Sequence, residues 1–96
     1  MNQFFGKYRG VVITNVDPMQ LGRILAQVPD VLGTIPSIWA LPCVPCGLPK
    51  EIGIALPQIG AAVWIEFEQG NPDYPVWTGC FYANAAETPP ALRNRK

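Results

Sequence analysis

The 96 residues suffice for one domain with a modest hydrophobic core, and they exclude a protein of two full domains. Eleven Pro and nine Gly favour short strands separated by turns, while a 49% share of hydrophobic residues excludes a disordered body. Three of the seven cations stand in the last four residues, so residues 1–92 carry four cations against seven acids, and this net charge of −3 argues against nucleic acid as a partner.

The first two strands are expected at residues 7–16 and 22–28. The first segment is rich in β-branched residues and ends at Asp17-Pro18, which cannot continue a sheet ladder. The second alternates with period two, which is typical of a strand with one buried face. The short connection between the segments predicts an antiparallel hairpin. The predicted inner face of the second strand consists of Ile24, Ala26 and Val28, and Leu25 lies on the other face.

Residues 37–44 form the third predicted strand, which Pro42 limits to a sheet edge or a bulge. Residues 45–60 hold Pro or Gly every few positions, so we expect no long helix there, only a brief strand at 52–54. The uncharged run 31–49 is nearly as long as a membrane span, but its prolines would break any spanning helix. Residues 1–15 lack a secretory signal. We therefore expect a protein made in the cytoplasm, without stable membrane insertion.

The three cysteines, Cys43, Cys46 and Cys80, are an odd number, which excludes a complete disulfide framework within one chain. Cys43 and Cys46 have the spacing of a zinc knuckle or a redox pair. Zinc needs four ligands, however, and the chain offers no His and only one further Cys. We expect no metal and no cofactor, and we interpret the cysteines as small buried hydrophobic residues.

Residues 62–82 predict a β-hairpin. The first strand, residues 62–68, alternates strictly, and the turn at 69–75 contains Gly, Asn, Asp and two Pro. An aromatic, β-prone second strand follows at 77–82. The turn has only Asn71 and Asp73 as oxygen ligands, too few for calcium. The predicted inner face of the first strand consists of Val63, Ile65 and Phe67, opposite Trp64, Glu66 and Glu68.

The predicted strands all lie within residues 1–82, and they suit a small closed barrel better than a sandwich because closure hides the strand edges. After residue 82 the composition shifts to Ala, Asn, Glu, Thr and Pro and then to basic residues. Residues 83–96 are therefore predicted to form an extended or flexible C-terminal tail.

Several segments carry a family resemblance in their order and spacing. They are residues 6–12 (GKYRGVV), 15–18 (NVDP), 21–24 (LGRI), 28–31 (VPDV), 39–40 (WA), 42–45 (PCVP), 63–68 (VWIEFE), 70–75 (GNPDYP) and 79–80 (GC). Over about residues 5–82 the chain resembles the OB-fold domain of phage baseplate assembly protein V and of the VgrG-type spike proteins of contractile injection systems.

The resemblance implies an all-β, five-stranded OB-fold Greek-key barrel without a long helix. It implies a non-enzymatic structural component of the central hub and spike of a contractile phage tail baseplate or related injection system. Such a domain usually forms a homotrimer and links a hub protein to a spike, needle or tip protein. The implied location is the virion tail baseplate or injection-system particle, after synthesis in the bacterial cytoplasm.

The chain differs from larger family members because no hub domain precedes the barrel and no β-helix or lysozyme module follows it. We therefore expect either a barrel that attaches to separate hub, needle or tip chains, or a piece of a longer spike protein. The natural-looking start MNQFF favours the first of these.

Apolar side chains exceed what the interior of one small barrel needs, and the surplus is a candidate partner interface. The candidate residues are Phe4, Phe5, Tyr8, Leu25, Trp64, Tyr74, Phe81 and Tyr82. Obligate trimers bury such residues between copies.

Two other functions have less support from the sequence. An enzyme is disfavoured because the chain has no His and Ser37 is its only serine, and solvation explains Glu66 and Glu68. The alternative function is an OB-type module that binds single-stranded nucleic acid by aromatic stacking in a basic groove. The stacking candidates are Tyr8, Trp39, Trp64 and Trp77, and the cations available in the strands are Lys7, Arg9 and Arg23. With so few cations, core or subunit contact is the better interpretation of the aromatic residues.

Overall fold

A computed structural model describes residues 3–45 and 55–93. Its strands are β1 (Tyr8–Thr14), β2 (Leu25–Gln27), β3 (Leu41–Pro42), β4 (Ala62–Phe67) and β5 (Pro75–Cys80). The helical elements are α1 (Pro29–Leu32), α2 (Pro90–Arg93) and the 3₁₀ turns η1 (Glu68–Gly70) and η2 (Ala85–Glu87). The predicted strand at 52–54 lies outside the described residues. None of the helices within the described ranges is long and apolar enough to cross a membrane.

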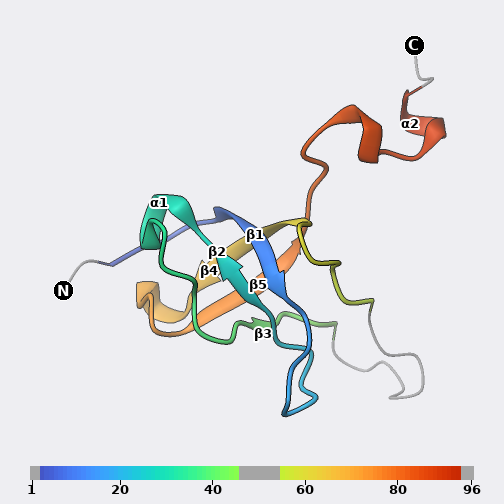
Figure 1. Cartoon of the computed structure of the whole chain (residues 1–96). Coiled ribbons are helices and arrows are strands. Elements are labelled where there is room, and N and C mark those ends of the chain that lie inside the picture. The colour runs from blue at the N-terminus through green and yellow to red at the C-terminus, as the bar shows by residue number, and fades with distance from the viewer. Residues whose placement is uncertain (1–2, 46–54, 94–96) are drawn as a thin grey trace.

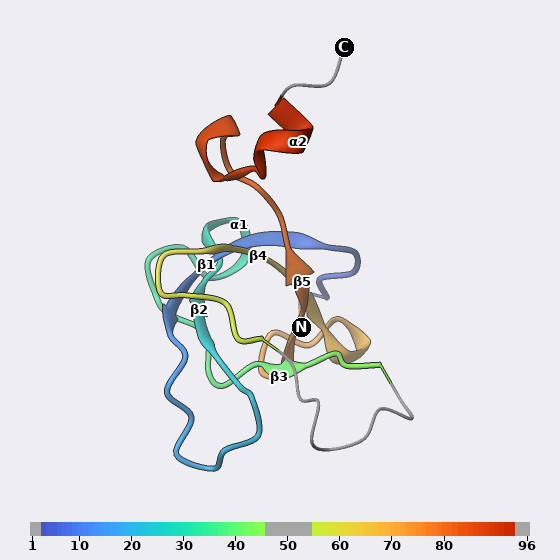
Figure 2. The same ribbon diagram turned by 90° about the vertical axis from the view of Figure 1, so that its right-hand side faces the viewer.

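The strands form one sheet in the order β2-β1-β4-β5-β3 (Figure 1). The sheet curls until its two ends meet, and Figure 2 shows the strands arranged around a ring. The ends are joined by an antiparallel bridge in which Ile24 and Ala40 exchange two backbone hydrogen bonds of 3.1 and 2.7 Å. The order around the ring is therefore β1-β2-β3-β5-β4, a five-stranded Greek-key barrel of the OB type, which confirms the predicted fold class.

Both predicted hairpins are present. β1 pairs antiparallel with β2, and β4 pairs antiparallel with β5. The pairing of β3 with β5 is parallel, a relation that short local patterns did not indicate. Several boundaries differ from the prediction: β1 and β2 are shorter than the predicted 7–16 and 22–28, and β5 ends at Cys80 rather than at residue 82. β5 begins at Pro75, inside the predicted turn, and the third strand is reduced to Leu41–Pro42 because the residues before it bend to pair with β2.

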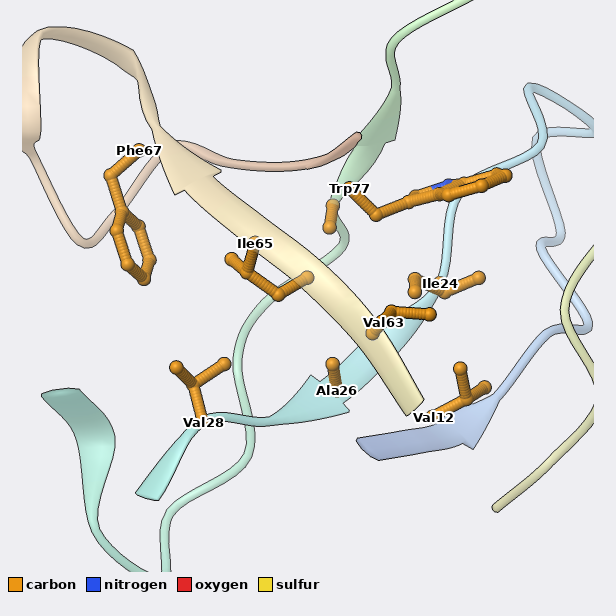
Figure 3. Packing of buried hydrophobic residues seen from close by; sticks show 9 residues of the cluster. Val12, Ile24, Ala26, Val28, Val63, Ile65, Phe67 and Trp77 are labelled. Atoms are coloured by element: carbon orange, nitrogen blue, oxygen red, sulfur yellow. The ribbon is translucent and has the colours of Figure 1, made fainter. Parts of the chain in front are cut away.

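The predicted inner face of β4 is confirmed. Val63 and Ile65 are fully buried and Phe67 is nearly so. Figure 3 shows these side chains opposite Ile24, Ala26 and Val28, which are also fully buried as predicted. Val12, Ala40 and Trp77 complete the cluster. Each fully buried aliphatic side chain contributes up to about 1.5–3 kcal/mol through apolar burial.

The short helix α1 was not predicted. It begins at Pro29, whose fixed φ suits the first helical turn, and it ends at Leu32, since the following Gly33 has a positive φ of 60°. Val31 and Leu32 on this turn pack against the core, so α1 covers one end of the barrel (Figure 1).

The described part of the predicted tail contains η2 and α2. The Asn84 side chain accepts a 3.0 Å hydrogen bond from the backbone N–H of Ala86 at the start of η2. Both turns stand away from the barrel in Figures 1 and 2. Flexibility of residues 83–96 stays a prediction.

Candidate partner interface

An aromatic and cationic cluster lies on the outer face of the sheet. Alternation in β4 turns Trp64 outward, and the β1 register places Arg9 directly opposite it. The backbone N–H of Phe81, just after β5, donates to the Ala62 carbonyl at 3.2 Å, and the Phe81 ring lies 4.5 Å from the Trp64 ring. The Arg9 guanidinium carbon lies 5.7 Å from the Trp64 ring centroid and 5.2 Å from that of Phe81. Arg9, Trp64 and Phe81 are called the outer cluster below.

Apolar side chains of β1 and β2 continue this outer face. Val11 is 44% exposed and Ile13 is 38% exposed on β1. Val11 pairs with Gln27, which lies two residues from the half-buried Leu25, so Val11 and Leu25 share a face. The sequence prediction named Leu25, Trp64 and Phe81 but missed Val11 and Ile13, because a β-branched run does not show which of its two faces is open.

The structure places Phe4 and Tyr8 in a different environment. Both are half-buried, and their rings approach Phe67 at centroid distances of 6.4 and 5.8 Å, close to the barrel core. The Tyr8 hydroxyl donates a 3.1 Å hydrogen bond to the Phe5 carbonyl. These two aromatic residues therefore help to cover the interior, and the structure does not bring them into the outer cluster. Their part in an interface stays a prediction.

Gly70 holds the N-terminal segment against the turn between β4 and β5. The Phe4 N–H donates to the Gly70 carbonyl at 2.8 Å. Gly70 has a φ of +74°, and a Cβ there would stand 3.0 Å from the Phe5 ring and 3.1 Å from the Phe4 nitrogen. Phe5 and Tyr74 are exposed near this turn, and Tyr82 is exposed beyond β5.

The loop between β1 and β2 is ordered by an ion pair between Asp17 and Arg23, called the clamp below, which the sequence analysis missed. The Asp17 carboxylate, whose side chain is 3% exposed, accepts hydrogen bonds from Arg23 Nε at 2.9 Å and Arg23 Nη2 at 2.7 Å. It also accepts from the backbone N–H groups of Met19, Leu21 and Arg23. The hydrogen bonds from the Arg23 side chain are the main cause that holds the pKa of Asp17 well below its ordinary value.

Two tryptophan side chains contact the clamp and the residue beside it. The Arg23 guanidinium carbon lies 5.2 Å from the Trp39 ring centroid, and Trp77 Nε1 donates a 2.9 Å hydrogen bond to the Gly22 carbonyl. An Asp followed six residues later by an Arg was the signal available in the sequence, but only the folded loop shows that the two side chains meet.

The nucleophilic side chains show no catalytic arrangement among the described residues. Ser37 is buried, and its Oγ accepts a 3.0 Å hydrogen bond from the Ala26 N–H, which makes it a structural residue. Cys43 and Cys80 are exposed, so the prediction of buried cysteines is wrong for both, because each lies at or just beyond the end of a short strand. Partial burial still raises the pKa of the Cys80 thiol and makes it less reactive. Cys46 lies outside the described residues.

The surface of the described residues has several open hollows, and two of them have volumes above 400 Å³. One, of about 450 Å³, is polar and is lined by Gln3, Glu68, Gln69, Asn71 and Tyr74. The other, of about 430 Å³, lies between the segment that enters β4 and the chain that leaves β5. In residues 3–45 and 55–93 no three His, Cys, Asp or Glu side chains gather as metal ligands.

Comparison with known families agrees with this geometry. The sequence profile of the "Type VI secretion system/phage-baseplate injector OB domain" matches residues 8–82, which covers all five strands. The chain belongs to this family. The resemblance drawn from the sequence segments is thereby confirmed.

One relative is the "Type VI secretion system spike protein VgrG5" of Pseudomonas aeruginosa, which is 39% identical over 44 residues. The aligned part covers 46% of this chain and 6% of that spike protein. The likeness therefore concerns a small part of the spike protein.

Proposed function

We propose that this chain is a non-enzymatic structural component of the central hub and spike of a contractile phage tail baseplate or related injection system. It assembles as a homotrimer and links a hub protein to a spike, needle or tip protein. Its place is the particle itself, after synthesis in the bacterial cytoplasm. The chain belongs to the injector OB domain family. The observation that carries the proposal is the outer cluster, which lies on the outer wall of its barrel.

The chemistry of this outer wall suits a protein partner. Trp, Phe and Arg are enriched in the central contacts of protein interfaces, and here the three side chains pack on one another. The neighbouring Val11 and Ile13 extend the apolar area across β1. A copy of the same chain or a hub protein would exclude water from this face.

A non-enzymatic role is supported by the arrangement of the reactive groups. The chain has no His, and its one serine is committed to a backbone hydrogen bond. Glu66 and Glu68 both line an open hollow of about 250 Å³, and Glu66 is engaged there in an ion pair with Lys7.

Binding of single-stranded nucleic acid gains no support from the cations whose side chains the structure describes. Lys7 forms a 3.0 Å ion pair with Glu66, Arg23 is held by Asp17, and Arg9 covers two aromatic rings. Trp77 is buried and cannot stack on bases. We therefore propose no nucleic-acid partner.

Sedimentation equilibrium over a wide concentration range tests the proposal. We expect a trimer, or a monomer that joins a ring when the hub chain of the same particle is added. Trp64→Ser should weaken this assembly, while Glu66→Gln on the same face should leave it unchanged, with circular dichroism showing that both variants are folded. A dilute monomer that ignores the hub chain would refute the proposal.

A further inference from the structure

Residues 3–5 lie against the turn between β4 and β5 and are called the strap. The half-buried Phe4 ring of the strap lies 6.2 Å from the Tyr8 ring and 6.4 Å from the Phe67 ring, measured between centroids. The Phe4 and Tyr8 rings meet edge to face, an arrangement that aromatic rings prefer. The Phe4 N–H donates its 2.8 Å hydrogen bond to the Gly70 carbonyl. Tyr8, Phe67 and Gly70 are called the Phe4 site.

The Phe4 site has the chemistry of a peptide-binding site. The Gly70 carbonyl accepts a main-chain hydrogen bond, which the N–H of any residue except proline can donate. The rings of Tyr8 and Phe67 contact the side chain and therefore select an aromatic residue. Proteins that bind linear peptides combine these two elements, since main-chain hydrogen bonds give affinity and side-chain contacts give specificity. Gly70 keeps the site open, because a Cβ there would stand 3.1 Å from the Phe4 nitrogen.

Few interactions hold the strap in place. In the part of the chain that the structure describes, one hydrogen bond joins the strap to Gly70, and a second joins the Tyr8 hydroxyl to the Phe5 carbonyl. The Phe5 side chain is 65% exposed. Gly6, just after the strap, has a φ of +93°, and a Cβ there would meet no atom within 4 Å, so the chain turns there in open space. Segments with so few buried contacts open locally at a far lower cost than global unfolding.

The open hollow of about 450 Å³ adjoins the strap and the same turn. Gln3 of the strap lines it together with Glu68, Gln69, Asn71 and Tyr74 of the turn. A peptide bound at the Phe4 site therefore has room for the residues that precede its aromatic side chain. The carboxylate and amide groups of this lining are donors and acceptors of the kind that a peptide backbone needs.

We propose that the strap is detachable and that the Phe4 site binds a linear peptide segment with an aromatic side chain, a place that the chain's own Phe4 fills in the free protein. A partner chain with such a segment competes with the strap for the Gly70 carbonyl and for the two rings. Because the strap is tethered, its effective concentration at the site is on the order of millimolar, which excludes weakly binding segments. The inference goes beyond the proposed function, since neither the homotrimer nor the outer cluster takes part in it.

NMR titration of the full-length chain with Phe4→Ser tests this proposal, because that variant leaves the Phe4 site without its aromatic side chain. The probe is the synthetic peptide MNQFFG, which has the sequence of residues 1–6. We expect the peptide to shift the backbone amide signals of Gly70 and Phe67 in the Phe4→Ser chain. The wild-type chain should bind it about tenfold more weakly, because its tethered strap competes for the site.

Two matched pairs of variants locate the binding. A peptide with Phe4→Ser should not bind, whereas a peptide with Phe5→Ser should still bind, because the Phe5 side chain is largely exposed in the strap. In the Phe4→Ser chain, adding Gly70→Ala should abolish binding, because the new Cβ enters the site. Adding Gly60→Ala instead should leave binding unchanged. Gly60 also has a positive φ, of +89°, but a Cβ there would meet no atom within 4 Å.

The outcomes separate this inference from the proposed function. A folded Phe4→Ser chain that does not bind the peptide at millimolar concentrations overturns the inference, and so does equal binding of the peptide that lacks the Phe4 ring. An unfolded Phe4→Ser chain also overturns it, because the strap would then be an essential part of the fold. A chain that binds the peptide but stays monomeric in the presence of the hub chain refutes the proposed function alone. A trimer that does not bind the peptide refutes this inference alone.

Discussion

The barrel interior and the loop between β1 and β2 both contain apolar residues in a fixed geometry, but different forces fix them. In the interior, Val63 and Ile65 are held by packing and have no contact with water. In the loop, Met19 and Leu21 are held through backbone hydrogen bonds to one buried carboxylate, while their side chains remain in water. Apolar residues in the first region stabilise the fold, whereas those in the second need stabilisation from the fold.

The difference shows that rigidity and burial are separable in a small domain. A domain of this size has a limited core, and a solvent-exposed loop can gain little order from it. The multiple hydrogen bonds to Asp17 provide that order locally instead. A loop stabilised in this way is free to offer its side chains to another surface.

The largest expected effect is in the interior. Ile65→Asp should unfold the domain, because the fully buried site offers no partner for a charge, and Ile65→Ala should cost about 2–5 kcal/mol. Urea denaturation monitored by tryptophan fluorescence measures both. Glu66→Asp is the control on the outer face. Its 3.0 Å contact with Lys7 is exposed, so the loss should stay below about 1 kcal/mol. A folded Ile65→Asp variant would contradict the assignment of inner and outer faces.

An intermediate effect is expected from the clamp, and it depends on pH. The pKa of Asp17 is lower in the folded chain than in the unfolded chain, so its carboxylate stabilises the fold above the unfolded-state pKa of about 4. This contribution is lost as the pH falls below that value. Asp17→Asn should therefore melt at a lower temperature than the wild type at pH 7, and the difference should shrink toward pH 2. Calorimetry across this range measures it, and equal melting at pH 7 would show that the clamp does not stabilise the loop.

The smallest expected effect is at the tip of the loop. Met19→Ser should change the free energy of unfolding by less than about 0.5 kcal/mol, because the side chain is already in water. Denaturant titration of the wild type and the variant measures the difference. A large loss of stability would mean that Met19 packs on its own barrel, and the contrast between the two regions would disappear.

Sequence alternation was sufficient to predict much of the barrel. The period-two patterns of residues 22–28 and 62–68 placed Ile24, Val28 and Ile65 on the buried face correctly. The parallel pairing of β3 with β5 could not be predicted in the same way, since it joins residues far apart in sequence through a strand of two residues. The helix α1 was missed because four residues are too few to show a helical period.

Less of the candidate interface could be predicted from the sequence. Outward alternation identified Trp64, but the guanidinium of Arg9 above it depends on the register between β1 and β4. Phe4 and Tyr8 looked like surplus apolar residues until the fold brought them to Phe67. The clamp was missed for the same reason, because the meeting of Asp17 with Arg23 is a property of the folded loop.

The closure of the ring sets where the barrel comes apart first. Five residue pairs join β4 to β5 and four join β1 to β4, whereas the two ends of the sheet are joined by one residue pair, Ile24 with Ala40, together with the hydrogen bonds between Ala26 and Ser37. We therefore expect thermal fluctuation to open the cylinder first at this joint, which would leave the five strands as a continuous open sheet in the order β2-β1-β4-β5-β3. Amide protons at the joint should exchange with solvent long before those in the middle of β4.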